Sequence, residues 1–261
     1  MSPNGSSERG NIDAMMVPKA TEVAAGLSVH AASPLDARFL YQEIFEHGTY
    51  ADVSLGEEPF VVDVGANIGL FTLFVKTHCP RAHVVAFEPL PELVSALRAN
   101  VAKFDLSDVE VYELALGGEE RDEVTFTYYP LLPSSSTLFP HDQERLKGVL
   151  SKSFPPRVVE RMFQGREVSV RVDRLSQYLD GGRPVDLLKI DAVGSELAIL
   201  RGIDRSLFPL LRNVFIDVQD INGRVAELCV LLEEMGMKPA VRVPPMSDGD
   251  GLNYLIHAVQ A

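Results

Sequence analysis

A short stretch in the first third of the chain combines an acid, two glycines and a second acid in an order that suits a nucleoside. Residues 60–62 are apolar and precede the turn D-V-G-A-N-I-G at 63–69, and Glu88 follows a second apolar run at 83–87. Glycines let the backbone turn sharply and approach a ligand, and an acid after the second strand can accept hydrogen bonds from ribose hydroxyls. The stretch predicts a strand, a glycine turn, a helix and a second strand around a nucleoside site. A tight turn followed by a solvated acid is the alternative.

The spacing of the glycines separates two kinds of nucleoside site. A dinucleotide site requires G-x-G-x-x-G, because the backbone must approach a pyrophosphate, but Ala66 and Asn67 occupy the place of the second glycine. This pattern argues against an NAD-dependent oxidoreductase. Two glycines four residues apart after an acidic strand end instead resemble motif I of class I S-adenosylmethionine (SAM) methyltransferases. The resemblance implies that the SAM site consists of Asp63, Gly65, Asn67, Gly69 and Glu88, with Phe87, Ala115 and Leu116 near the adenine.

Composition and charge narrow the class of protein. The 261 residues contain 24 Lys and Arg and 37 Asp and Glu, which gives a formal net charge of −13. Such a surface repels phosphate backbones, so no nucleic-acid partner is expected. The two cysteines, Cys79 and Cys229, form no C-x-x-C pair and give no zinc or redox signature. No apolar run is long enough to cross a membrane and no signal-peptide core is present, so a soluble, cytoplasmic protein is expected.

The elements that must position these residues alternate between strand and helix along most of the chain. Residues 1–33 show little periodicity and are expected to form a flexible arm, followed by a single domain over 34–261. Repeated alternation predicts an α/β fold with a mostly parallel, doubly wound sheet. The last two strands, expected at 238–243 and 253–259, have no clear helix between them and predict a terminal antiparallel pair.

A helix is expected just before the glycine turn. Apolar residues recur at helical spacing over 34–45, and Ser33 stands in the capping position. The helix either packs on the core or acts as a flap whose Tyr41 and Tyr50 close over the ligand. We therefore include Tyr50 among the candidate substrate-binding residues.

The middle of the chain, residues 119–175, is too irregular for the alternating core and is expected to be a substrate-binding insertion. His141 stands at a helix start in this segment, and its ordinary pKa range suits proton transfer, although an exposed histidine without such a role is the simpler alternative. Just before it lies a loop with four consecutive hydroxyl side chains, Ser134, Ser135, Ser136 and Thr137.

Asp191 is the main catalytic candidate. It follows a buried strand expected at 185–190, and open α/β sheets bind their ligands at the carboxyl ends of the strands. Its carboxylate could contact the SAM amino group, orient the acceptor, accept a proton or merely cap the next helix. Asp217 and Asp220 could converge with it on a hard cation, but the spacing alone does not support a metal site, and none is expected.

Several blocks together make the chain resemble the FkbM-type family of SAM-dependent methyltransferases over about residues 38–258. The resemblance implies a class I methyltransferase fold with a Rossmann-like, seven-stranded sheet, and a tailoring enzyme that methylates hydroxyl oxygens of polyketides or nonribosomal peptides. No Asn/Asp-Pro-Pro-Tyr turn of the kind associated with N-methylation follows Asp191, which also favours oxygen. The blocks are YQEIF at 41–45, DVGANIGLF at 63–71, FEPLP at 87–91, LLKIDAVGSELAILRGID at 187–204 and FIDVQDINGR at 215–224.

Two positions depart from the family pattern. At 189–193 family members usually read K-I-D-V-E, whereas this chain has Val193 in place of the glutamate. At 217–220 they usually read E-V-H-D, whereas this chain has Gln219 in place of the histidine. A carboxylate and an imidazole are therefore absent, and a proton acceptor at either place must have moved or is not needed. We predict an O-methyltransferase that acts on a small hydroxylated natural product, free or bound to a carrier protein, with Asp191 and His141 as catalytic residues. The alternative is a methyltransferase-like protein without methyl transfer that serves as an auxiliary or docking partner in a synthase complex.

Overall fold

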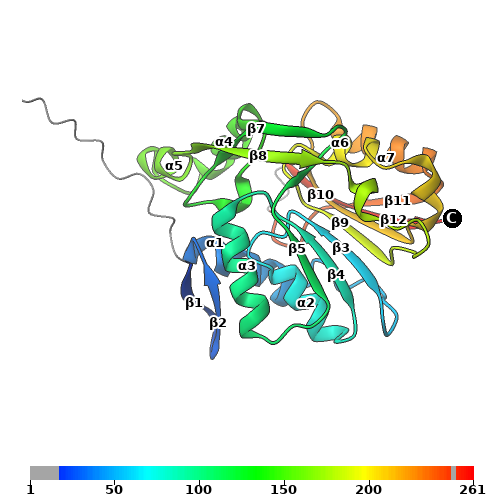
Figure 1. Cartoon of the computed structure of the whole chain (residues 1–261). Coiled ribbons are helices and arrows are strands. Elements are labelled where there is room, and N and C mark those ends of the chain that lie inside the picture. The colour runs from blue at the N-terminus through cyan, green and yellow to red at the C-terminus, as the bar shows by residue number, and fades with distance from the viewer. Residues whose placement is uncertain (1–17, 248–250) are drawn as a thin grey trace, which may run out of the picture.

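A mostly parallel seven-stranded sheet forms the centre of the molecule (Figure 1). The structure is a computed structural model and describes residues 18–247 and 251–261. The strand order is β11-β12-β10-β9-β3-β4-β5, and β12 runs antiparallel to both of its neighbours. This arrangement confirms the predicted fold class, including the terminal antiparallel pair. The strands are β3 (Phe60–Val64), β4 (His83–Phe87), β5 (Val109–Tyr112), β9 (Leu187–Ile190), β10 (Asn213–Gln219), β11 (Met237–Arg242) and β12 (Asn253–Gln260).

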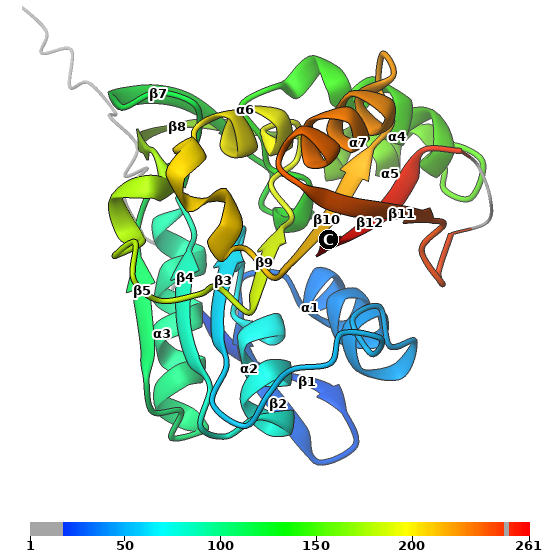
Figure 2. The same ribbon diagram turned by 90° about the vertical axis from the view of Figure 1, so that its right-hand side faces the viewer.

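Helices cover both faces of this sheet (Figure 2). Alternate residues of a strand point to opposite faces, which is why β3 is apolar almost throughout. Val61 belongs to one core cluster with Leu73 and Leu93, whereas Val62 belongs to the opposite cluster with Leu200 and Leu228. The first face carries α1 (Pro34–Tyr41), α2 (Leu70–His78) and α3 (Pro91–Lys103), and the second carries α6 (Glu196–Arg201), α7 (Arg224–Glu234) and the 3-10 helices η4 (Leu175–Tyr178) and η5 (Arg205–Leu210).

Helix α1 begins where the sequence predicts. Ser33 is its N-cap and accepts a hydrogen bond from the backbone N–H of Asp36 at 3.4 Å, and Pro34 occupies the first turn. The helix continues as a π-helical turn, η1 (Gln42–Glu46), which sequence periodicity did not indicate. Single π-turns often occur at functional sites.

A β-hairpin precedes α1. Its strands, β1 (Lys19–Ala24) and β2 (Leu27–Ala31), pair antiparallel and dock on α1 and α3. The Asn100 side chain on α3 accepts a hydrogen bond from His30 N at 2.6 Å and donates one to His30 O at 3.0 Å. The expectation of a flexible arm is therefore wrong for the described part of this segment. The remainder, residues 1–17, lies outside the described residues.

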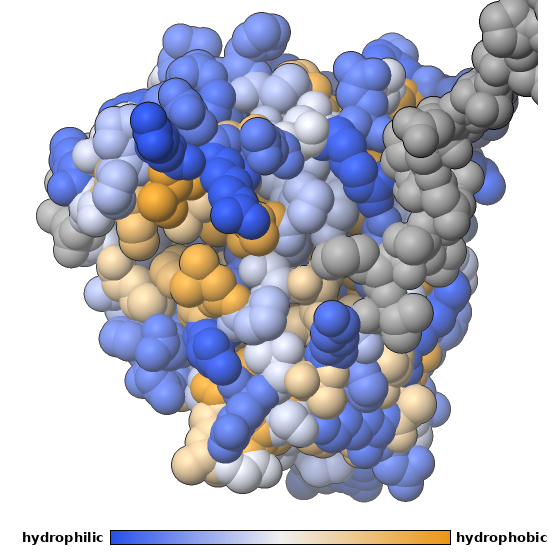
Figure 3. Space-filling model, turned by 90° about the vertical axis from the view of Figure 1, so that its left-hand side faces the viewer, coloured by the Kyte–Doolittle hydropathy of each residue, from blue (hydrophilic) through white to orange (hydrophobic). Residues whose placement is uncertain are grey.

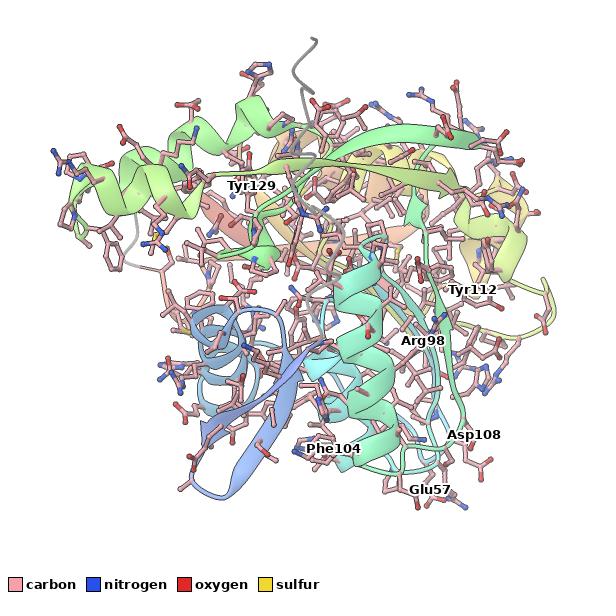
Figure 4. All side chains as sticks on the ribbon, turned by 60° about the vertical axis from the view of Figure 1, so that its left-hand side comes forward. Glu57, Arg98, Phe104, Asp108, Tyr112 and Tyr129 are labelled. Carbon is pink, nitrogen blue, oxygen red and sulfur yellow. The ribbon has the colours of Figure 1, made fainter. Side chains whose placement is uncertain are left out.

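The irregular middle segment leaves the central sheet and folds above its carboxyl edge. A three-stranded sheet of order β6-β8-β7 begins and ends it, as the long β7 and β8 show in Figure 1. Between β7 and β8 the chain forms two short helices whose apolar sides meet Tyr129, labelled in Figure 4. The elements are β6 (Ala115–Leu116), β7 (Arg121–Tyr128), η2 (Pro133–Ser135), η3 (Pro140–Asp142), α4 (Gln143–Leu150), α5 (Pro156–Met162) and β8 (Arg166–Asp173).

None of the helices within the two described ranges has the length and apolar character needed to cross a bilayer.

Candidate functional site

Two adjoining pockets lie at the carboxyl ends of β3, β4, β9 and β10. We call the first the turn pocket, because the glycine turn after β3 forms one of its walls. We call the second the insertion pocket, because the segment 119–175 forms much of its wall. The residues that line both pockets are Leu40, Glu43, Ser134, Asp191 and Val193.

The glycine turn brings β3 and β9 into close backbone contact. Gly65 has φ +74°, and a Cβ atom at this position would lie 1.8 Å from the carbonyl oxygen of Asp191. Gly69 has φ +83°, and a Cβ there would lie 3.1 Å from Leu97 Cγ on α3. A Cβ atom at Gly65 would force the two backbones apart, whereas one at Gly69 would only need the Leu97 side chain to move slightly.

Asp63 lies behind the pocket wall. Its carboxylate is fully buried and accepts hydrogen bonds from Thr72 Oγ1 at 2.8 Å and from Lys189 Nζ at 3.0 Å. Asp63 does not line the turn pocket, whereas Lys189 does and also donates to Gly65 O at 2.9 Å. This position gives Asp63 a structural part in holding Lys189, in place of the direct ligand contact that the sequence predicted.

Lys189 is the cation of this buried network. Burial lowers the pKa of Lys189, but the carboxylates of Asp63 and Asp191 more than offset this effect and raise its pKa above the ordinary value. Its ammonium lies 3.8 Å from Asp191 Oδ2. A positive charge therefore stands beside the catalytic candidate at the boundary of the two pockets.

Glu88 faces the turn pocket at the end of β4. Its Oε2 accepts a hydrogen bond from Asn67 N at 2.9 Å, and its Oε1 accepts one from Leu90 N at 3.0 Å. Burial raises the pKa of Glu88 to about 7, although both of these bonds lower it. The predicted Phe87, Ala115 and Leu116 line the same pocket and give it an apolar wall.

Of the five candidate substrate-binding residues, four line a pocket and Thr137 does not. Ser134 lines both pockets, while Ser135 lines the insertion pocket and Ser136 the turn pocket. Thr137 is buried outside both and donates to Val193 O at 2.6 Å, so it anchors the insertion to the chain after β9. Tyr50 lines the turn pocket and packs against aromatic rings of α2 and β10.

His141 is exposed in η3 and lines neither pocket. The structure therefore does not bring it to Asp191, and its predicted catalytic role gains no support from its position.

The insertion pocket has an apolar wall and an acidic one. Its volume is about 290 Å³, and its apolar residues come from α1, α4 and α5. Figure 3 shows apolar surface among charged side chains on the face that carries α1 and α5. Among the residues that line the pocket, Leu35, Phe39 and Phe154 are exposed. The acidic residues that line this pocket are Asp36, Glu43, Asp191, Glu196 and Asp217.

Burial changes the protonation of these acids. It raises the pKa of Asp36 to about 6 and the pKa values of Glu43 and Glu196 to about 7. Burial also raises the pKa values of Asp191 and Asp217, and neighbouring carboxylates raise them further. The pocket therefore holds protons near neutral pH that an exposed acidic surface would have released.

These raised pKa values predict a pH-dependent stability of the ligand-free protein. Because the folded state binds these protons more tightly than the unfolded chain, the stabilisation is complete below about pH 4 and is lost as the pH rises through about 7. We expect urea unfolding to give a free energy of unfolding lower by about 2 kcal/mol or more at about pH 8 than at about pH 5. Glu196→Gln should make the dependence shallower, and a stability that rises over this range would contradict the argument.

Of the three acids considered for a cation, Asp220 lies apart from the other two. Asp191 and Asp217 line the insertion pocket, whereas Asp220 accepts a hydrogen bond from Val225 N at 3.2 Å at the start of α7. In the part of the chain that the structure describes, no three His, Cys, Asp or Glu side chains are grouped as a metal site would require.

Sequence reasoning missed three of the acids that line the insertion pocket. Asp36 and Glu196 lie in the first turns of α1 and α6, where acids are ordinary helix-start residues. Glu43 lies in the YQEIF block, which was the available signal, and the π-helical turn directs it to the boundary of the two pockets.

The sheet order and the glycine turn that meets Glu88 define the class of this protein, the class I methyltransferases that use SAM. The turn pocket fits that cofactor: Glu88 would hold the ribose, the apolar wall the adenine, and the turn around Gly65 the amino-acid portion. The model of the methyltransferase FkbM domain matches residues 63–239. The chain belongs to the FkbM methyltransferase family.

Relatives agree with this assignment, and a solved structure shares the fold. Methyltransferase sdnD of Sordaria araneosa is 36% identical over 222 residues, which cover 80% of this chain and 85% of sdnD. The 31-O-demethyl-FK506 methyltransferase FkbM of Streptomyces tacrolimicus is 32% identical over 243 residues, which cover 88% of this chain and 93% of that protein. The crystal structure of methyltransferase FkbM from Methylobacillus flagellatus matches with a TM-score of 0.50 and 15% identity, over 80% of this chain and 45% of that one, and shows the fold alone.

Proposed function

We propose that this protein methylates a hydroxyl oxygen of a small natural product of the polyketide or nonribosomal peptide type. The observation that carries the proposal is that Asp191 lies where the turn pocket, which Glu88 and the glycine turn line, meets a separate pocket with an apolar wall. A relative whose name specifies methylation at an oxygen of FK506 supports oxygen as the acceptor atom.

The residues at this boundary suit the deprotonation of a hydroxyl. SAM supplies an electrophilic methyl group when it is bound, and the acceptor oxygen must lose its proton as it becomes an ether. Asp191 would accept that proton, because burial and neighbouring acids raise the pKa of its carboxyl and make it a stronger base than an exposed aspartate. Lys189, 3.8 Å away, favours the charged form and keeps the carboxylate available. This assignment replaces the acid and imidazole that are absent at Val193 and Gln219.

The insertion pocket would bind the acceptor. Its apolar wall of Leu146, Leu150 and Met162 suits a hydrocarbon body, and the exposed Phe39 and Phe154 continue this surface to the outside. We propose that the acceptor arrives free or tethered to a carrier protein. The net charge of −13 opposes a nucleic-acid partner.

Calorimetric titration with SAM and S-adenosylhomocysteine tests the turn pocket. We expect Glu88→Gln to weaken the binding of both by about 10- to 100-fold, because it removes the charge from an acceptor of ribose hydroxyls. Wild-type binding should also tighten as the pH rises through about 7, the pKa of Glu88, since only the ionised carboxylate is acceptor-only. Glu234→Gln, which removes an exposed acid from α7, is the matched control and should bind as the wild type does.

Transfer itself is tested with methyl-labelled SAM and a panel of hydroxylated polyketides and peptides, each beside a copy with its hydroxyls blocked. Label should enter only the unblocked compounds, and Asp191→Asn should lower kcat by at least about 100-fold while SAM binding persists. Tight SAM binding with no label in any acceptor would favour the alternative of an auxiliary protein without methyl transfer.

A further inference from the structure

One end of the insertion pocket presents oxygen atoms that lack partners. Glu196 is 1% exposed, and its Oε1 accepts a hydrogen bond from Gly194 N at 2.9 Å. Its Oε2 has no hydrogen-bond partner among the described residues. The neighbouring Arg224 Nη1 is 4.0 Å from this oxygen, and Arg224 Nη2 already binds Asp142 at 2.8 Å. A buried carboxylate oxygen without a hydrogen bond lowers the stability of the folded protein. This indicates that the molecule that occupies the pocket donates a hydrogen bond to it.

A second orphaned oxygen faces the same pocket from β10. Gln219 Oε1 is buried and has no hydrogen-bond partner in the described part of the chain. Asp217 stands two residues earlier on the same strand, so both side chains leave the same face of the sheet. The charge of Glu196 is also one of the causes that raise the pKa of Asp217. Two carboxyls and an amide therefore line this pocket together.

A cofactor in the turn pocket would not contact Glu196, Asp217 or Gln219, because these residues do not line that pocket. Glu43 and Asp191 line both pockets, so the positive charge of Lys189 in the turn pocket can offset their negative charges. The carboxylate of Asp36 accepts hydrogen bonds from Ser134 Oγ at 2.6 Å and Ser134 N at 3.2 Å. Glu196, Asp217 and Gln219 line the insertion pocket alone, and no described Lys, Arg or His lines it with them.

We propose that the acceptor carries a cationic nitrogen, such as a protonated amine, next to an apolar body, and that Glu196, Asp217 and Gln219 bind it. This inference rests on the proposed function, because it takes the insertion pocket as the acceptor site. An ammonium group donates up to three hydrogen bonds and offsets the repulsion between the two carboxylates, whereas a hydroxyl can donate only one and leaves the charges unbalanced. A carboxylate-bearing acceptor would add to that repulsion and should be rejected.

Three matched probes test the proposal in the presence of saturating S-adenosylhomocysteine. Each has a decyl chain with a terminal hydroxyl and carries an ammonium, a hydroxyl or a carboxylate on the neighbouring carbon. Calorimetry should show that the ammonium probe binds at least about 10-fold more tightly than the diol, and the carboxylate probe more weakly than either. Binding of the ammonium probe at about pH 7 should release protons, measured in two buffers of different ionisation enthalpy, because a cation lowers the pKa of the carboxyls that it meets.

Variants separate recognition by charge from a general loss of binding. Glu196→Gln keeps an oxygen for Gly194 N but loses the charge, so it should remove most of the advantage that the ammonium probe has over the diol. The exposed control Glu234→Gln should retain the full advantage. An ammonium probe that binds no more tightly than the carboxylate probe, while S-adenosylhomocysteine binds normally, overturns this inference alone. Failure of S-adenosylhomocysteine to bind the wild type overturns the proposed function and this inference with it.

Discussion

Gly65→Ala is expected to abolish measurable SAM binding and to lower the free energy of unfolding by roughly 3 kcal/mol or more. Two effects add at this position. The new Cβ would lie 1.8 Å from Asp191 O, which no side-chain rotation can relieve, and alanine would have to adopt φ +74°. The β3 turn and the chain after β9 would separate, and the boundary between the two pockets would be lost. Urea unfolding and titration with SAM measure the two consequences.

Gly223→Ala supplies the matched control for this substitution. Gly223 has a similar φ of +78°, but a Cβ atom there would have nothing within 4 Å. It should therefore show only the cost of the left-handed conformation, about 1–2 kcal/mol, and keep its affinity for SAM. Equal destabilisation of the two variants would show that backbone strain, and not the approach of Gly65 to Asp191, makes the glycine necessary.

Lys189→Met is expected to lower the free energy of unfolding by about 3–5 kcal/mol, because it leaves the Asp63 carboxylate buried without its cation. Asp63 would keep only its hydrogen bond from Thr72. The double variant with Asp63→Asn should be more stable than the sum of the two single changes predicts, since it removes both charges together. Urea unfolding of the four proteins gives this coupling energy.

A surface ion pair provides the comparison for Lys189. Arg212 and Asp186 form one at 2.6 Å, and the Arg212 side chain is 60% exposed. Arg212→Met should cost about 1 kcal/mol or less, because water already screens that pair. Additive effects of Asp63→Asn and Lys189→Met would contradict the view that the buried pair acts as a unit.

The cofactor half of the site could be predicted because it is local in sequence. Gly65, Asn67 and Glu88 lie within 24 residues of each other, counted from 65 to 88, and the strand, turn and helix that join them have strong local signals. The direction in which the Asp63 side chain points could not be predicted from such local signals. Whether an acid at a strand end faces the ligand or a buried lysine depends on Lys189, which lies 126 residues further along the chain.

The acceptor half was mostly hidden, because its residues come from elements far apart in the chain. Asp36, Glu43, Glu196 and Asp217 lie in α1, η1, α6 and β10, and each is unremarkable in its own segment. Their meeting depends on tertiary packing above the sheet edge. The N-terminal hairpin was missed for a similar reason, since its strands are short and are held by Asn100 of α3.

The insertion is attached to the core by contacts of two kinds. Thr137 and Arg145 donate to the main-chain oxygens of Val193 and Asp220, which every sequence provides. Ser134 and Asp142, by contrast, bind the side chains of Asp36 and Arg224.

A chimera in which another family member supplies the segment between β7 and β8 therefore has a simple design rule. The graft should keep the side chains that hold it to the core: a hydroxyl that reaches Asp36, a hydroxyl that reaches Val193 O, a basic side chain that reaches Asp220 O and an acid that reaches Arg224. Such an exchange would replace the apolar wall that α4 and α5 contribute to the insertion pocket, while Glu196, Asp217 and Gln219 stay with the core.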